Sequence, residues 1–151
     1  MPRHWTGLVA VSSLILIAAL TEARAADTNN MPLAPDLRSV RAKIKAKDFK
    51  AALAELQPLE GKGEFADVYN LMGFSYRKSG DQTRAFVYYE KALALDPNHR
   101  GALEYQGELF VETRQLDKAK ANLTRLGRLC PFGCEEWTDL DEAIKAAGKP
   151  R

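Results

Sequence analysis

The 151-residue sequence is poor in the side chains that most often hold metal ions, with two cysteines and two histidines, His4 and His99. A closed structural metal site needs about four ligands, so we expect no metal. The chain also lacks the phosphate-binding, nucleophile-elbow and zinc-peptidase motifs. We therefore predict no catalytic residues, no cofactor and a protein that is not an enzyme.

The sequence has no large excess of charge of either sign, because it contains 22 lysines and arginines and 20 aspartates and glutamates. This balance gives no reason to expect nucleic acid or an acidic membrane surface as a partner. Long apolar runs are absent beyond the first 25 residues. A membrane-spanning helix needs about 20 consecutive apolar residues. We expect no membrane span in the mature chain.

The first 25 residues have the pattern of a secretory signal peptide. Arg3 precedes an apolar run at residues 8–20, and Ala23-Arg24-Ala25 places small residues before a cut. We predict cleavage after Ala25 and export to a bacterial periplasm, since the run is too short for a membrane anchor. Residues 26–34 are polar and contain proline, which favours a flexible leader.

Residues 66–99 carry a regular pattern of small, aromatic and proline residues. The pattern comprises Tyr69, Met72, Gly73, Tyr76, Ala85, Tyr89, Ala92 and Pro97. It resembles the tetratricopeptide repeat, whose signature of about 34 residues has these residue types at these positions. In such a repeat, the small Gly73 and Ala85 allow two helices to approach closely. Asp81 is placed to cap the second helix.

Residues 100–133 repeat the pattern with Gly107 and Pro131, but Gln106 replaces an apolar residue and predicts looser packing. Residues 35–65 carry two apolar stripes, one of them Ala52, Leu56 and Leu59, and are expected to form a degenerate repeat of uncertain register. His99, at a repeat boundary, is better explained as a helix-start residue than as a general base.

Residues 134–151 are expected to form a capping helix and tail. Trp137, Leu140 and Ile144 make one apolar stripe that can cover the last repeat, while Glu136 and Asp139 are expected to point to water. This end also resembles the tails of small secreted bacterial tetratricopeptide proteins. The predicted fold is an all-α tetratricopeptide-type solenoid of about seven helices with a C-terminal cap.

Cys130 and Cys134 flank the turn Pro131-Phe132-Gly133. In an oxidising compartment two cysteines across a short turn most often form a disulfide, which here would clamp the capping helix. Two alternatives stay open. One is a redox role, which Glu135 and Glu136 disfavour because they oppose a thiolate; the other is free or intermolecular thiols.

The resemblance also implies a binding face, because the first helix of each repeat lines a concave groove in this family. The positions that usually face the groove are occupied by Arg38, Asn70, Phe74, Arg77, Lys78, Glu104, Glu108 and Glu112. We expect a groove that is basic at its N-terminal end and acidic at its C-terminal end. Phe74 either anchors a peptide or packs on a neighbouring helix. Capture of a C-terminal carboxylate is not expected.

These features predict a non-catalytic adaptor of the periplasm that binds a peptide or helix of a protein partner in its groove. The alternatives are a self-associating component of an envelope complex and a thiol relay through Cys130 and Cys134. The sequence does not identify the partner.

Overall fold

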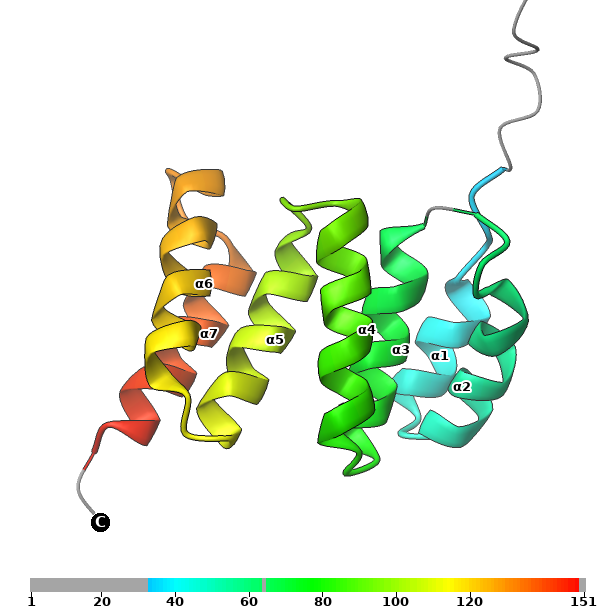
Figure 1. The fold of residues 1–151 in the computed structure, drawn as a ribbon, viewed down its shortest axis with the longest axis horizontal. Coiled ribbons are helices and arrows are strands. Elements are labelled where there is room, and N and C mark those ends of the chain that lie inside the picture. Colours follow the sequence, from blue (N-terminus) through cyan, green and yellow to red (C-terminus); the bar gives the residue numbers. More distant parts are fainter. Residues whose placement is uncertain (1–32, 64, 150–151) are drawn as a thin grey trace, which may run out of the picture. The chain divides into compact units, whose positions relative to one another are not determined.

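The computed structural model describes residues 33–63 and 65–149. The predicted signal peptide (1–25) and nearly all of the predicted leader (26–34) lie outside these residues. The described part contains seven α-helices and no strand, which confirms the all-α prediction (Figure 1). The helices are α1 (Arg38–Lys45), α2 (Phe49–Leu56), α3 (Ala66–Lys78), α4 (Gln82–Leu95), α5 (Arg100–Glu112), α6 (Leu116–Leu129) and α7 (Glu135–Ala147), and a short 3-10 turn, η2 (Gln57–Leu59), follows α2.

The helices are stacked as successive pairs, α1 with α2, α3 with α4 and α5 with α6. The second helix of each pair packs on the first helix of the next, so that α2 contacts α3, α4 contacts α5 and α6 contacts α7. Helix α7 also packs on α5. This arrangement is a tetratricopeptide-type solenoid, in which each pair buries the face that its neighbour exposes. Within the described residues, no helix has both the length and the apolar character that crossing a bilayer requires.

Side-chain caps define where several helices begin. Asp48 accepts a hydrogen bond from the Ala51 amide (3.0 Å), and Asp81 accepts one from the Arg84 amide (2.9 Å). His99 Nδ1 accepts from the Ala102 amide at 3.1 Å. Each cap satisfies an amide that the first helical turn leaves without a partner. The interpretations of Asp81 and His99 as helix-start residues are confirmed.

Close helix approach depends on two glycines. A Cβ added at Gly73 would lie 2.6 Å from the ring of Tyr89, and one at Gly107 would lie 2.5 Å from the side chain of Leu140. Tyr89 and Leu140 are fully buried. Leu140 belongs to α7, where Trp137 and Ile144 pack around the same core. The apolar stripe predicted for the capping helix is therefore confirmed.

Gln106 does not loosen the second repeat in the way its polarity predicted. Its side chain is buried, and its Oε1 accepts a hydrogen bond from Asn122 Nδ2 at 3.1 Å. Asn122 Nδ2 also donates to the carbonyl of Leu103 at 3.0 Å. Because a buried amide is tolerated when its hydrogen bonds are made, this pair replaces the apolar contact expected there.

The turn inside each pair has the same backbone form in all three repeats. Lys47, Gly80 and Arg114 adopt positive φ angles of 60°, 87° and 59°. Lys47 precedes Gly80 by 33 positions and Arg114 follows it by 34. This correspondence aligns α1 and α2 with the later pairs at the turn. Positive φ is unfavourable for residues other than glycine.

Replacement of Arg114 by glycine is expected to raise the free energy of unfolding by about 1 kcal/mol, because glycine adopts the left-handed conformation without steric cost. Urea denaturation of the two proteins measures the change. Gly80→Ala is the matched reverse substitution and should lower stability. A loss of stability in Arg114→Gly would contradict the assignment of strain to this turn.

Candidate partner-binding face

Four helices, α1, α3, α5 and α7, contribute residues to two adjoining hollows. The first, here called the acidic hollow, has a volume of about 290 Å³ and is lined by Arg41, Asp67, Asn70, Leu71, His99, Gly101, Glu104, Tyr105, Glu135, Glu136 and Asp139. The second, here called the aromatic hollow, has a volume of about 210 Å³ and is lined by Arg41, Ile44, Lys45, Leu71, Phe74 and Tyr105. Arg41, Leu71 and Tyr105 line both, so the two hollows form one continuous face.

Phe74 lies at the centre of the aromatic hollow. Its side chain is half-buried, with the ring centroid 4.8 Å from that of Tyr105 and 6.4 Å from that of Phe49. The ammonium of Lys78 lies 5.4 Å from the ring centroid. Phe74 therefore packs on neighbouring helices and also contributes surface to the hollow, so the two roles considered for it do not exclude each other.

The position of Arg77 in the repeat predicted an unpaired cation that faces the groove, and the structure places it differently. Its side chain is only 5% exposed, and it joins α3 to α5 through ion pairs with Glu108 and Glu112, the latter at 2.6 Å. Burial would lower the pKa of Arg77, but its hydrogen bonds to Glu112 and Glu108 raise that pKa above its usual value. Glu108 and Glu112 offset the charge of Arg77 and leave the cluster with one net negative charge, so Arg77 adds no free positive charge to the groove.

Glu104 and Asn70 are the buried polar groups of the acidic hollow. Burial is the main cause that raises the pKa of Glu104 to about 8, and the charge of Glu108 adds to it. No ion pair or hydrogen bond of the Glu104 carboxyl occurs among the described residues. The amide oxygen of Asn70 also has no partner there. An unsatisfied buried polar group costs about 1–3 kcal/mol, and the Asn70 oxygen shares this state with the hydroxyl groups of Ser75 and Tyr89 in the core.

Arg38 is placed apart from the other predicted groove residues. Its guanidinium pairs with Asp36 at 2.7 Å, its side chain is 90% exposed, and it lines neither hollow. The structure thus brings Asn70 and Glu104 into one hollow and Phe74 into the other. Lys78 lies beside Phe74, and Arg77, Glu108 and Glu112 form the ion-pair cluster that joins α3 to α5.

Several lining residues were missed because residues 134–151 were interpreted only as a cap. Glu135, Glu136 and Asp139 line the acidic hollow instead of simply pointing to water. Extending the repeat by a further 34 positions from Arg100 reaches Cys134, which makes α7 equivalent to α3 and α5. That extension was the signal that could have placed Glu135 on the binding face.

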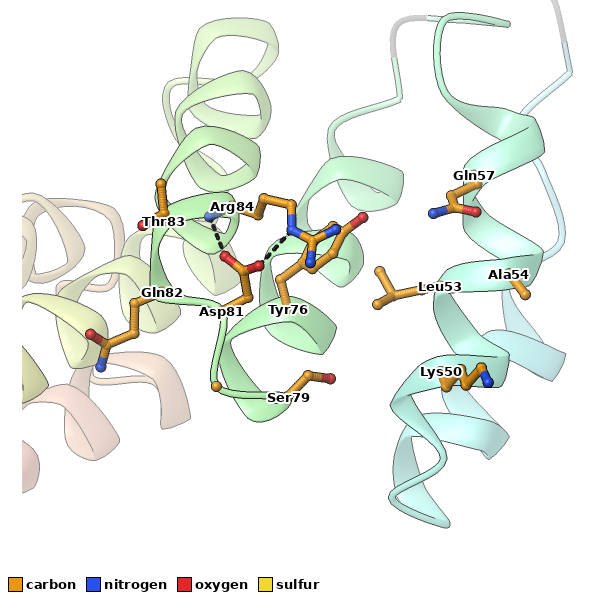
Figure 2. Close-up of a pocket in the computed structure, with 11 residues that line it drawn as sticks. Lys50, Leu53, Ala54, Gln57, Tyr76, Ser79, Asp81, Gln82, Thr83 and Arg84 are labelled. Carbon is orange, nitrogen blue, oxygen red and sulfur yellow. Dashed lines mark hydrogen bonds and ion pairs between the residues drawn. The ribbon is translucent and has the colours of Figure 1, made fainter.

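A larger hollow lies elsewhere, between α2 and the turn that joins α3 to α4 (Figure 2). Its volume is about 800 Å³. Arg84 lies over the ring of Tyr76, 4.3 Å from its centroid, and pairs with Asp81 at 2.6 Å. These polar groups satisfy one another, and the hollow contains none of the predicted groove residues.

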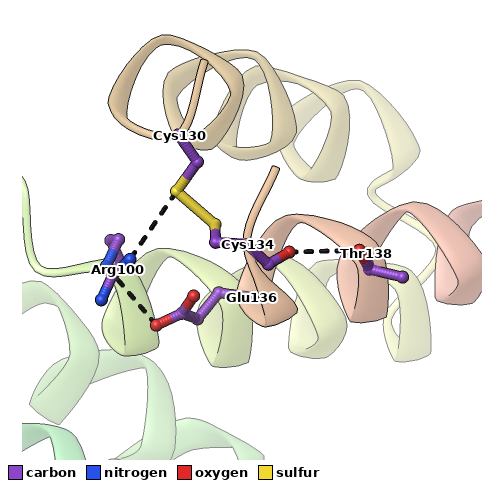
Figure 3. The surroundings of a disulfide bond; sticks show 5 residues. All are labelled: Arg100, Cys130, Cys134, Glu136 and Thr138. Atoms are coloured by element: carbon purple, nitrogen blue, oxygen red, sulfur yellow. Dashed lines mark hydrogen bonds and ion pairs between the residues drawn. A yellow bond between two sulfur atoms is a disulfide. The ribbon is translucent and has the colours of Figure 1, made fainter. Parts of the chain in front are cut away.

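Cys130 and Cys134 are joined by a disulfide, with their Cα atoms 5.7 Å apart (Figure 3). Arg100 lies beside it and pairs with Glu136 at 3.5 Å. The two sulfurs and a carboxylate oxygen of Glu136 lie within 4.8 Å of one another. Bonded sulfurs are not thiolates, and thiolates are the form in which cysteine binds metals.

Comparison with known proteins supports the repeat assignment. Residues 66–99 match the tetratricopeptide repeat family, so the resemblance drawn from the sequence is confirmed over this segment.

The relatives are proteins named uncharacterized protein ycf37. The chain is 38% identical over 73 residues to that of Guillardia theta, covering 48% of this chain and 40% of the relative. It is 26% identical over 130 residues to that of Pyropia yezoensis, covering 78% and 73%. It is 32% identical over 66 residues to the ycf37 protein of Porphyra purpurea, covering 44% of this chain and 38% of the relative. The matched segments thus span less than half of the Guillardia and Porphyra proteins.

The buried position of Arg77 predicts an order of mutational effects. Glu108→Gln with Glu112→Gln leaves the guanidinium buried without an anion and is expected to lower the free energy of unfolding by about 3 kcal/mol. Arg77→Met removes the buried charge itself and leaves two partly hydrated carboxylates, so a loss of about 1 kcal/mol is expected.

Chemical denaturation of both variants measures this order. Glu142→Gln on the exposed surface of α7 is the control and should change stability by less than about 0.5 kcal/mol. The interpretation fails if Arg77→Met is the more damaging change.

Proposed function

We propose that the protein is a non-catalytic interaction module that binds an extended peptide or a helix of a protein partner across the face formed by α1, α3, α5 and α7. The observation that carries this proposal is the half-buried Phe74, which lines the aromatic hollow together with Tyr105. Aromatic side chains in such hollows often supply much of the energy of peptide binding. The tetratricopeptide repeat at residues 66–99 supports a role in binding proteins.

The aromatic and acidic hollows support a two-part recognition of the partner. An apolar side chain fits beside Phe74, Ile44 and Tyr105, where it displaces water from apolar surface. A polar or charged side chain fits the adjoining acidic hollow. Because the two hollows share Arg41, Leu71 and Tyr105, one short segment can reach both.

The location proposed for this module is a bacterial periplasm, which the signal pattern of residues 1–25 supports. The Cys130–Cys134 bond then acts as a structural staple that fixes the entry of α7. The closed loop is short, so its contribution to stability is expected at or below the lower end of about 2–4 kcal/mol. In this proposal the staple also holds Glu135 and Glu136 at the edge of the acidic hollow.

Self-association is the alternative that a specific observation favours. Phe132 is fully exposed in the disulfide loop, and Leu129, three positions earlier at the end of α6, is 36% exposed. An exposed aromatic side chain next to an apolar one is a feature of contact surfaces. A thiol relay through Cys130 and Cys134 is the other alternative that we retain.

Loss of the Phe74 ring is expected to weaken peptide binding at least tenfold. Peptides that bind residues 26–151 are first selected from a displayed peptide library. Calorimetry then measures the dissociation constants of these peptides for the wild type and for Phe74→Ala. Thermal denaturation verifies that the variant is folded under the conditions used. A tenfold loss of affinity corresponds to about 1.4 kcal/mol of binding free energy, as expected for a binding anchor.

Phe132→Ala is the matched control, because it removes a fully exposed aromatic ring that lines neither hollow. It should leave peptide affinity unchanged. Equal binding by wild type and Phe74→Ala would contradict the proposed face. Concentration-dependent sedimentation that Phe132→Ala abolishes would favour self-association instead.

Export should remove residues 1–25. When the full-length protein is expressed in a Gram-negative bacterium, N-terminal sequencing of the periplasmic form is expected to begin at Ala26. An Ala25→Arg variant places a charge at the cut and should accumulate uncleaved. Recovery of the wild-type protein only in the cytoplasm, still beginning at Met1, would contradict the proposed location.

A further inference from the structure

The acidic hollow has an excess of negative charge. Five carboxylates line it, together with one arginine and one histidine: Asp67, Glu104, Glu135, Glu136 and Asp139 against Arg41 and His99. Both of these side chains lie at Asp67, with the Arg41 guanidinium at 3.3 Å and His99 Nε2 at 3.1 Å. Glu136 pairs with Arg100. Glu104, Glu135 and Asp139 have no cationic partner among the described residues.

Two buried polar side chains lie in the same hollow with hydrogen-bonding capacity unused. Glu104 is 6% exposed and Asn70 is 4% exposed. The carboxyl of Glu104 and the amide oxygen of Asn70 make no hydrogen bond within the described residues. The Asn70 amide oxygen accepts hydrogen bonds, and the Glu104 carboxyl only accepts them when it is ionised, which its raised pKa of about 8 places at mildly alkaline pH or beside a bound cation. In that state the hollow lacks a donor.

Gly101 keeps this hollow open. A Cβ at that position would lie 3.2 Å from Asn70 Nδ2 and would narrow the space between α3 and α5. The hollow also adjoins the aromatic hollow around Phe74. A segment bound beside Phe74 can therefore extend a side chain toward Glu104 and Asn70.

We propose that the acidic hollow is a binding site for the guanidinium group of an arginine side chain carried by the partner peptide. This assignment rests on the proposed function and specifies the chemistry of the partner. The guanidinium donates to the ionised Glu104 carboxylate and, after the Asn70 side chain rotates to expose its buried amide oxygen, to that oxygen, and its charge is balanced by Glu135 and Asp139.

Arginine fits the site better than lysine for two reasons. Its planar group presents five donors, which suits acceptors supplied by separate helices, whereas an ammonium is a compact group with three donors. A guanidinium is also more weakly hydrated, so transferring it next to buried groups such as Glu104 and Asn70 is easier. The site would hold the cation while Phe74 contacts a neighbouring apolar residue.

Acetyl-arginine amide is the probe for this site, and acetyl-citrulline amide is its neutral control of nearly the same shape. Both are titrated into residues 26–151 at pH 8 and followed by ¹⁵N–¹H NMR. We expect saturable shifts at the Asn70 side-chain amide and the Gly101 backbone amide with arginine, and none with citrulline. Glu104→Gln should weaken arginine binding at least tenfold, whereas Glu142→Gln on the exposed part of α7 should not change it.

Asp139→Asn provides a second, exposed variant that should weaken binding without disturbing the core. The proposal is overturned if citrulline binds as well as arginine, if Glu104→Gln leaves the affinity unchanged, or if no saturable shift occurs. The probe has no apolar group that could bind beside Phe74, so it tests the acidic hollow alone. If the probe does not bind but peptide binding still depends on Phe74, the arginine site is excluded and the proposed function stands.

Discussion

The packing of each helix pair on the next is the constraint on which this structure depends. A single pair has an apolar face that it cannot bury alone, so the stack is stable only where a neighbour covers that face. Gly73 allows Tyr89 to approach α3, and Gly107 allows Leu140 of α7 to approach α5. The same packing sets the helices α1, α3, α5 and α7 beside one another, and these supply the binding face.

Burial of polar groups distinguishes two parts of that face. Arg77 is buried but fully paired with Glu108 and Glu112, which stabilises the contact of α3 with α5. Glu104 and Asn70 are equally buried but lack partners among the described residues. A fully satisfied buried network favours a single structure, whereas an unsatisfied one lowers stability. We propose that a ligand of the second arrangement supplies the missing hydrogen-bond partners.

The sequence predicted the fold well because its determinants are local and periodic. Gly73 and Pro97 recur 34 positions later as Gly107 and Pro131, and the helix pairs of the structure follow this period. The site was harder to predict, because it depends on which charges pair across helices. The sequence spacing of Arg77 and Glu112 does not reveal that they meet, and Asp139 lines the hollow only because α7 continues the stack. The signal-peptide and leader predictions concern residues outside the described ones.

The measurement that tests the central claim most directly is amide hydrogen exchange of residues 26–151 with and without a bound peptide. Exchange reports local opening, and ligand contact slows it. Our account predicts slower exchange in α3, α5 and α7, with little change in α4 and α6. Slower exchange confined to α4, α6 or the disulfide loop would contradict it, because the partner would then bind outside the proposed face.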